Sequence, residues 1–272
     1  MSQPPTPKCG LVAVIGAPNA GKSTLVNQLV GQKVAITSAK AQTTRARMLG
    51  IALHELDGVP VQMILVDTPG LHRPRTLLGQ RLNDLVEQTL GDVDVIGFCI
   101  PANEKIGPGD NFINEQLSEF RRAKLVAVIT KSELVSPEQL AEQLVAVSNL
   151  RDWRAIVPVS AVAEDQLEVL TKVLIDLLPE SPALYPPEAV TDETLENRIC
   201  ELIREAALEG VRDELPHSIA VTIDEMSRRK GQNLTDIHAN IFVERDSQKG
   251  IIIGHKGSRL IDVGKRSRLE IE

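Results

Sequence analysis

A glycine-rich segment between an apolar run and a helical pattern restricts the fold of this chain more than any other feature. Residues 16–23 read Gly-Ala-Pro-Asn-Ala-Gly-Lys-Ser and follow the apolar run Leu11–Ile15 directly. Glycines allow backbone N–H groups to turn toward an anion, and a following helix adds unsatisfied N–H groups and its positive dipole end. The pattern therefore predicts a phosphate-binding loop between a buried strand and a helix.

The order of the apolar runs predicts an α/β domain with a doubly wound, mostly parallel sheet. Short continuous apolar runs alternate with longer segments of helical spacing as far as Leu178, which is typical of strands covered on both faces by helices. Ser136 and Pro137 form a helix-start signal. We expect strands at Leu11–Ile15, Val61–Val66, Val93–Ile100, Leu125–Ile129 and Ala155–Val159, and helices over 22–30, 77–90, 110–122, 137–148 and 164–178.

A proline-rich segment divides the chain into two domains. Four of the nine residues 179–187 are proline, which cannot continue a helix and indicates a stiff connector. We place a phosphate-loop domain over 8–178, a linker over 179–190 and a second domain over 191–272. The second domain is predicted to be small and α+β, with a helix at Thr194–Leu208, strands at Ser218–Ile223 and Ile237–Val243, and a final helical pattern.

Composition limits the class of protein. The chain has 272 residues, of which 42% are hydrophobic and 25% charged, and no apolar run approaches the roughly 20 residues of a membrane helix. The first eight residues lack the pattern of a secretory signal. We expect a soluble cytoplasmic protein whose scattered cysteines, Cys9, Cys99 and Cys200, are free thiols.

Charge is distributed unevenly along the chain. The net charge is −7, but Arg228–Arg268 contains ten Lys or Arg and four Asp or Glu, so this stretch is +6 and the remainder is −13. The asymmetry predicts a basic surface, which could face RNA, an anionic membrane or only solvent. Aromatic residues are 2% of the chain, which disfavours RNA-binding folds that stack bases on aromatic platforms.

Residues in and after the glycine-rich segment are suited to bind a nucleotide and Mg²⁺. Lys22 is expected to reach the β and γ phosphates, and the Ser23 hydroxyl to bind Mg²⁺. Asp67 ends an apolar strand, so its carboxylate should lie beside the phosphate loop and hold the metal through water. The N–H of Gly70 is a candidate sensor of the γ-phosphate.

A polar segment between these residues is a candidate switch. A threonine hydroxyl that joins Mg²⁺ only when the γ-phosphate is present would order the segment Gln42–Arg45, as in a nucleotide switch. Thr44 is our choice for this metal ligand, and Thr43 remains an alternative.

Three segments resemble the Era family of translation-factor-related GTPases. They are Gly16–Thr24, Lys40–Arg45 and Val66–Leu71, and the resemblance covers nearly the whole chain. It implies binding of GTP and GDP, and Mg²⁺-dependent hydrolysis of GTP to GDP and phosphate, with Lys22, Asp67 and Gly70 as catalytic residues. The implied nucleotide contacts are Gly16, Asn19, Ala20, Gly21, Lys22, Ser23, Thr24, Asp67, Gly70, Thr130, Lys131, Glu133, Ser160 and Ala161.

The base-recognition segment departs from the family pattern. The family reads guanine with Asn-Lys-x-Asp after the fifth strand, whereas residues 130–133 are Thr-Lys-Ser-Glu. Glu133 can still accept from the guanine donors and the Lys131 stem can cover the ring, but Thr130 cannot supply the amide bonds of Asn. We therefore expect a weaker guanine preference than usual. Ser160-Ala161 resembles the last family motif, whose backbone N–H contacts the base oxygen.

The hydrolytic position also differs from GTPases that use glutamine. Leu71 follows Gly70, and an aliphatic side chain cannot orient the attacking water, so we expect slow intrinsic turnover supported by electrostatic stabilisation. Relatives with Asn in the phosphate loop use a potassium ion where others use an arginine finger. The resemblance thus implies K⁺ beside Asn19.

A glycine turn near the C-terminal end resembles the RNA-binding loop of type II KH domains. The turn Gly254–Gly257 lies in the basic stretch, where backbone N–H groups and a basic residue can meet RNA phosphates. The resemblance implies a further strand after the final helix, so we expect an incomplete second domain of reduced stability. The implied RNA contacts are Gly254, His255, Lys256, Gly257 and Arg259.

The resemblance implies that the partners are small-subunit (16S) rRNA and the 30S ribosomal subunit, whose assembly the protein would assist. Two other functions stay open. One is a signalling GTPase whose basic end docks peripherally on the inner face of the cell membrane. The other is a nucleotide-gated RNA-binding scaffold with negligible hydrolysis, which Leu71 and the altered base motif would suit.

Overall fold

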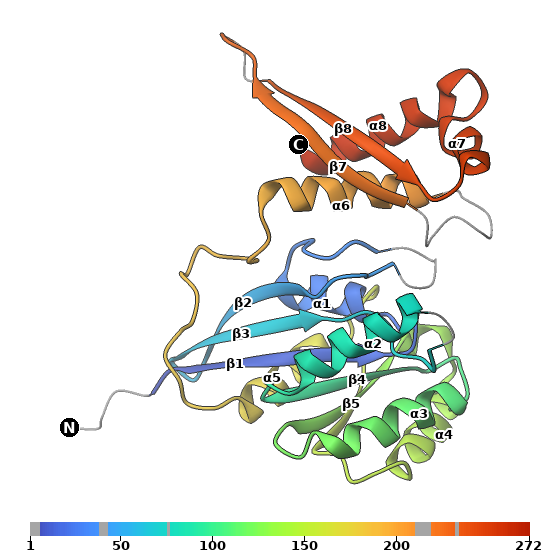
Figure 1. The fold of residues 1–272 in the computed structure, drawn as a ribbon. Helices are drawn as coiled ribbons and strands as arrows, with labels where there is room; N and C mark the ends of the chain where they lie inside the picture. The colour runs from blue at the N-terminus through green and yellow to red at the C-terminus, as the bar shows by residue number, and fades with distance from the viewer. Residues whose placement is uncertain (1–5, 38–42, 75–76, 210–218, 232–233) are drawn as a thin grey trace. The chain divides into compact units, whose positions relative to one another are not determined.

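The chain forms two compact units. The structure is a computed structural model that describes residues 6–37, 43–74, 77–209, 219–231 and 234–272 (Figure 1). The first unit contains Met1–Ala35 and Thr44–Asp192, and the second contains Ile36–Thr43 and Glu193–Glu272. Thr37 and Thr43 thus group with the C-terminal part of the chain.

A six-stranded sheet runs through the described part of the first unit, in the order β2-β3-β1-β4-β5-β6 (Figure 1). The strands are β1 (Lys8–Gly16), β2 (Met48–Leu56), β3 (Val59–Asp67), β4 (Val95–Pro101), β5 (Lys124–Thr130) and β6 (Ala155–Pro158). Only the β2–β3 pair is antiparallel among these neighbours. The predicted doubly wound, mostly parallel sheet is confirmed.

The edge strand β2 is absent from the sequence-based prediction. It pairs with β3 through the tight turn Asp57-Gly58, whose residues have positive φ angles of 53° and 78°. An Asp-Gly pair between apolar runs is a strong hairpin signal because both turn positions favour left-handed backbone. That signal was available in the sequence and would have predicted the strand.

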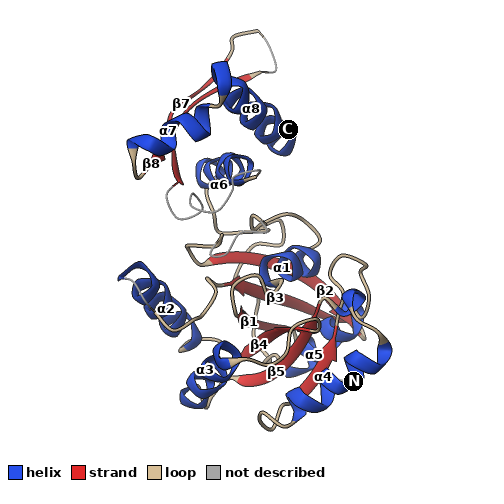
Figure 2. Ribbon diagram, turned by 90° about the vertical axis from the view of Figure 1, so that its right-hand side faces the viewer, coloured by secondary structure: helices blue, strands red, loops and turns tan. Residues whose placement is uncertain are grey.

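Helices cover both faces of this sheet (Figure 2). On one face, α1 (Lys22–Val30) and α5 (Leu167–Leu177) pack in one apolar cluster. On the other face, α2 (Leu77–Leu90), α3 (Pro108–Gln116) and α4 (Pro137–Ser148) pack in a second cluster. Ser136 caps α4 as predicted, because its Oγ accepts from the Gln139 N–H at 3.4 Å.

The helix predicted over 110–122 is too long at its C-terminal end. α3 stops at Gln116, and a 3₁₀ turn follows at Leu117–Glu119. Nη2 of Arg151 donates to the Asn114 carbonyl at 2.5 Å, which is the acceptor that another helical turn would use. This contact from a distant residue was not visible in the local pattern.

Two further sequence-based predictions can be compared with the structure. Cys9, Cys99 and Cys200 are free, as predicted, and burial raises the pKa of Cys99 to about 12. In the described residues, every helix is too short or too polar to cross a membrane.

The proline-rich connector is tied to the first unit. Gln62 is 2% exposed, and its Oε1 accepts from the N–H groups of Leu184 at 2.8 Å and Tyr185 at 2.9 Å. Further along, the Val190 carbonyl accepts from the N–H of Ile51 on β2 at 2.8 Å. The connector therefore covers part of an edge strand that would otherwise expose unpaired backbone groups.

The second unit is a small α+β layer, as predicted. Its elements are α6 (Leu195–Leu208), β7 (Ile219–Arg228), β8 (Thr235–Val243), α7 (Asp246–Ile253) and α8 (Ser258–Ile271). Thr194 caps α6 by accepting from the Asn197 N–H at 3.2 Å. β7 and β8 pair as an antiparallel hairpin, and their apolar side chains join those of α6, α7 and α8 in one core.

Candidate functional site

The glycine-rich loop between β1 and α1 has a backbone that few residues could adopt. Gly21 caps α1 with a φ of 84°, and Asn19 is left-handed with a φ of 63°. A Cβ on Gly16 would lie 2.6 Å from the carbonyl oxygen of Cys99, so only glycine fits there. The loop opens onto the N-terminus of α1, where free N–H groups favour an anion.

Four predicted site residues come together at this loop. Nζ of Lys22 donates to the carbonyl of Ala17 at 2.9 Å, a bond that phosphate oxygens could replace. Ser23 Oγ donates to Asp67 Oδ2 at 2.6 Å. Thr44 Oγ1 lies 3.1 Å from Ser23 Oγ and donates to Asp67 Oδ2 at 3.3 Å. Thr44 thus lies at the predicted metal site.

Thr43 is placed differently from Thr44. It is buried, and its carbonyl accepts from Nη2 of Arg204 on α6 at 2.7 Å within the second unit. In the same unit, the N–H of Thr37 donates to Oε1 of Glu205 at 2.9 Å. Within the predicted switch segment Gln42–Arg45, Gln42 lies outside the described residues.

The carboxylate and hydroxyls fit Mg²⁺. Oδ1 of Asp67 is buried and has no hydrogen-bond partner in the described part of the chain. Mg²⁺ prefers hard oxygen ligands such as carboxylates, hydroxyls and phosphates. Burial raises the pKa of Asp67 and lowers that of Lys22, since both charges are costly without partners. A metal ion beside Asp67 and a phosphate beside Lys22 would offset these costs.

Gly70 and Leu71 have distinct structural roles. A Cβ on Gly70 would lie 2.8 Å from the backbone nitrogen of Pro18, so glycine allows this segment to touch the phosphate loop. Leu71 donates its N–H to the Gly16 carbonyl at 3.1 Å, and its side chain is 3% exposed in the core. Its burial agrees with the expectation that Leu71 does not orient water.

Thr130 contacts the phosphate loop rather than facing solvent. It is 3% exposed, and its Oγ1 donates to the Ala20 carbonyl at 2.7 Å. Position 130 is Thr in place of Asn, and the Thr side chain forms a hydrogen bond between the base-recognition segment and the phosphate loop. Sequence reasoning missed this role, because the two residues are 110 positions apart.

The other predicted base contacts surround Thr130. Lys131 is left-handed, with a φ of 59°, and Glu133 lies exposed in a 3₁₀ turn. Ser160 is buried, and its Oγ accepts from the Ala163 N–H at 3.0 Å. The N–H of Ala161 has no acceptor among the described residues, which leaves it available to a base oxygen.

The predicted RNA-binding turn joins α7 to α8 in the second unit. Gly254 has a φ of 71°, Lys256 of 50° and Gly257 of 77°, so the turn depends on left-handed backbone. His255 and Lys256 are exposed. Arg259 is placed differently, since its Nη2 donates to the carbonyls of Ala207 and Glu209 and holds the end of α6.

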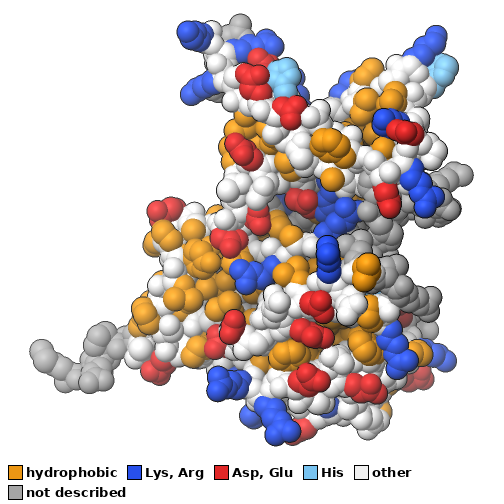
Figure 3. All heavy atoms as spheres, viewed as in Figure 1, with side chains coloured by type: hydrophobic (Ala, Val, Ile, Leu, Met, Phe, Trp, Pro, Cys, Tyr) orange, Lys and Arg blue, Asp and Glu red, His pale blue; other side chains and the backbone are white. Residues whose placement is uncertain are grey.

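Apolar and basic side chains share the surface around this turn. Figure 3 shows basic atoms at the tip of the β7–β8 hairpin, next to acidic atoms, and basic and histidine atoms again near α7, with apolar atoms on the surface between these two places. The exposed apolar residues that flank the turn are Ile251, Ile253, Leu260 and Ile261, between 40% and 58% exposed. Such a surface can meet phosphates and bases together without an aromatic platform.

Comparison with known proteins identifies two domain families in the chain. Residues 11–131 match the family described as 50S ribosome-binding GTPase, and residues 214–272 match the KH domain. The GTPase Era of Streptomyces coelicolor is 58% identical over 274 residues, covering 97% of this chain and 85% of that protein. The GTPase Era of Mycolicibacterium smegmatis is 58% identical over 268 residues, covering 97% and 88%.

A solved structure extends the similarity to the fold. The crystal structure of Era in complex with MgGDPNP and nucleotides 1506–1542 of 16S ribosomal RNA is 37% identical. It aligns with a TM-score of 0.92 over 98% of this chain and 89% of that one. With a GTPase domain, a KH domain and this degree of identity over nearly its whole length, the chain belongs to the Era family of GTPases.

Proposed function

We propose that this protein is a GTP-hydrolysing switch of the cytoplasm that binds small-subunit (16S) rRNA and assists assembly of the 30S ribosomal subunit. The observation that carries the proposal is the meeting of Lys22, Ser23, Thr44 and Asp67 at one loop, in a chain that also carries the basic glycine turn. The Era relative bound to MgGDPNP and 16S rRNA supports the same pairing of ligands.

Hydrolysis in this site depends on charge and position. Lys22 would bind the β and γ phosphates, while Ser23, Thr44 and Asp67 would hold Mg²⁺. Bound Mg²⁺ supplies positive charge that stabilises the transferring phosphoryl group. The Gly70 N–H donates to the γ-phosphate. Because Leu71 is buried, none of its atoms positions the attacking water, and intrinsic turnover is slow.

The nucleotide state reaches the second unit through the switch segment. Thr44 follows Thr43, whose carbonyl is bound by Arg204 within the second unit. A γ-phosphate and metal that hold Thr44 at this site would therefore also restrain its neighbour Thr43, which α6 holds. Differential contacts of this kind are what a ligand needs to shift a conformational equilibrium.

Replacing Thr130 with valine is expected to weaken GDP binding. The substitution keeps the shape of the side chain but leaves the Ala20 carbonyl without its donor, which costs about 1 to 3 kcal/mol of stability. GDP affinity should fall to the extent that binding must restore the loop conformation that this bond holds. Thr130→Ser keeps the hydroxyl and is the matched control. Isothermal titration with GDP measures both, and equal affinities for the two variants would remove this role.

Exchange of potassium for sodium is expected to slow GTP hydrolysis by about tenfold or more while leaving GDP affinity nearly unchanged, because the extra charge acts on the transition state. Asn19→Gly should remove this salt difference, since glycine adopts the left-handed φ of 63° without strain. Single-turnover assays in the two chloride salts test the idea. Equal rates for the native protein would contradict a potassium site at Asn19.

Sedimentation with purified ribosomal subunits tests the proposed function. We expect GTP-dependent co-sedimentation with small subunits, weaker co-sedimentation with GDP, and none with large subunits. Lys256→Glu, in the exposed turn, should reduce it. Binding to large subunits only, or to anionic phosphatidylserine vesicles in preference to small subunits, would assign the protein a different partner, including peripheral membrane association.

A further inference from the structure

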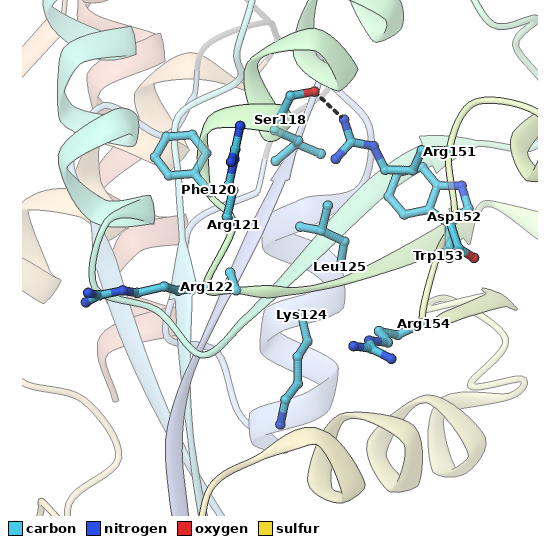
Figure 4. Close-up of a pocket in the computed structure, with 12 residues that line it drawn as sticks. Ser118, Phe120, Arg121, Arg122, Lys124, Leu125, Arg151, Asp152, Trp153 and Arg154 are labelled. Atoms are coloured by element: carbon cyan, nitrogen blue, oxygen red, sulfur yellow. Dashed lines mark hydrogen bonds between the residues drawn. The ribbon is translucent and has the colours of Figure 1, made fainter.

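A basic hollow lies on the first unit, apart from the nucleotide site of that unit. We use this name for a cavity of about 620 Å³ lined by residues 117–118, 120–125 and 151–154 (Figure 4). These segments precede or begin β5 and β6, whereas the base-recognition residues lie at the opposite ends of the same strands, with Thr130 as the last residue of β5 and Ser160 just after β6. Since β5 has seven residues, the hollow and the nucleotide site are separated by about 20 Å of strand.

The basic hollow concentrates positive charge on an acidic protein. Five of its lining residues are cations, Arg121, Arg122, Lys124, Arg151 and Arg154, against the single carboxylate of Asp152. The chain as a whole has a net charge of −7. Arg121, Arg122 and Arg154 are exposed and form no ion pair with any described residue. An unbalanced cluster of this kind creates a local positive potential that attracts polyanions.

One guanidinium in the basic hollow is held in place. Arg151 Nε donates to Asn114 Oδ1 at 2.8 Å, and its Nη2 donates to Ser118 Oγ at 3.0 Å. Its guanidinium carbon lies 5.7 Å from the ring centre of Trp153. Burial lowers the pKa of Arg151, and its hydrogen bonds go to neutral groups. Positioned guanidinium groups without a carboxylate partner suit phosphate oxygens.

The directions of the cations favour an extended ligand. Figure 4 shows Arg121, Arg122, Lys124 and Arg154 pointing in different directions around the basic hollow. Divergent cations reach several phosphates along a strand better than they enclose one small ion. Trp153 offers no free stacking platform, because Arg151 covers its ring and its Nε1 donates to the Val147 carbonyl at 2.9 Å. We therefore expect the basic hollow to contact the phosphodiester backbone of a nucleic acid and not its bases.

We propose that the basic hollow binds the phosphodiester backbone of ribosomal RNA, independently of sequence. It would be a second RNA contact, in addition to the Gly254–Gly257 turn. This inference rests on the proposed function. It adds to that function a contact made by the GTPase domain itself. Binding of this type releases counterions, so each phosphate contact contributes about 0.7 to 0.9 to the slope of log affinity against log salt.

Charge reversal of two exposed arginines tests the inference. In Arg122→Glu with Arg154→Glu, we expect the salt slope for small-subunit binding to fall by about 1.4 to 1.8 and affinity near 0.15 M salt to fall about tenfold to thirtyfold. Arg122→Gln with Arg154→Gln should change the slope equally. GTP hydrolysis without ribosomal subunits should be unchanged in both.

The matched control carries the same charge change elsewhere on the first unit. Arg81 on α2 and Lys172 on α5 are also exposed and without ion pairs to described residues, so Arg81→Glu with Lys172→Glu controls for net charge. Equal slopes and affinities for the two charge-reversed proteins would overturn the inference. If Lys256→Glu still reduced binding, the proposed function would survive that result. Failure of the native chain to bind small subunits would overturn both.

A free polyphosphate is the alternative ligand for the same cations. Isothermal titration of the Mg·GDP-loaded protein with inorganic triphosphate separates the two sources of phosphate. Triphosphate binding that the Arg122/Arg154 charge reversal abolishes, together with unchanged subunit binding, would assign the basic hollow to a small anion and overturn the RNA contact. Absence of triphosphate binding, with the expected loss of subunit affinity, supports it.

Discussion

Lys22→Ala is expected to lower GTP affinity more than a hundredfold and to abolish measurable hydrolysis. Lys22 is 6% exposed and lies at the loop predicted to bind the phosphates. Removing one member of a buried charge pair costs about 3 to 5 kcal/mol, because the remaining charges lose their partner. Isothermal titration with GTP and single-turnover hydrolysis measure the two losses. Lys172→Ala, an exposed lysine on α5, is the control.

The same variant separates a binding defect from a folding defect. Alanine removes a buried charge, whose burial lowers the pKa of Lys22, but it also leaves the Asp67 carboxylate without its cation, and the apparent melting temperature of the variant measures the balance of these two effects. GTP should then no longer raise it, since a ligand stabilises only a protein that it binds. Unchanged GTP affinity and turnover in Lys22→Ala would show that the phosphates bind elsewhere.

Gly254→Ala is expected to lower RNA affinity more than tenfold while leaving GTP hydrolysis intact. Gly254 has φ 71° and ψ 175°, a region of backbone conformation that is essentially reserved for glycine. An added Cβ would lie 2.9 Å from the backbone nitrogen of Arg259 and 2.7 Å from its Cβ. Because the backbone must move to relieve this contact, the exposed Lys256 loses its position. Titration with 16S rRNA at several salt concentrations measures the effect.

A second glycine in the same region provides a matched control. Gly250 lies inside α7, and a Cβ there would meet nothing within 4 Å. Gly250→Ala should therefore bind RNA normally and stabilise α7 by up to about 1 kcal/mol, because alanine favours helix. If both alanine variants bound RNA as the native chain does, the Gly254–Gly257 turn would not be the RNA contact.

The phosphate site was predictable because its information is local. Residues 16–23 are contiguous, and their glycines, lysine and serine specify a loop between a strand and a helix. Asp67 could be added because the end of a parallel strand places it at the same sheet edge. Thr44 required only a polar segment between the two. The structure brings these side chains together, as the hydrogen bonds of Ser23 show.

Other features depend on contacts between residues far apart in sequence. The Thr130–Ala20 bond and the Arg151–Asn114 bond join segments whose proximity only the folded sheet creates. The first gives Thr130 a role that its identity did not suggest, and the second ends α3 early. Likewise, the cations of the basic hollow come from two segments, and neither one forms a long basic run. The spacing of apolar residues along the sequence does not show that two distant segments meet in the folded chain.

The proline-rich connector 179–190, which is hydrogen-bonded to the first unit, determines where a protease could cut between the two domains. Proteases require an extended, accessible backbone, and hydrogen-bonded or proline-rich segments resist them. The connector is held from Ser181, which donates to Pro7, to Val190, which accepts from Ile51, and α6 begins at Leu195. The cleavable interval is thus confined to a few residues around Asp192. Limited digestion there would release a first fragment that keeps its proline-rich tail and therefore its covered sheet edge.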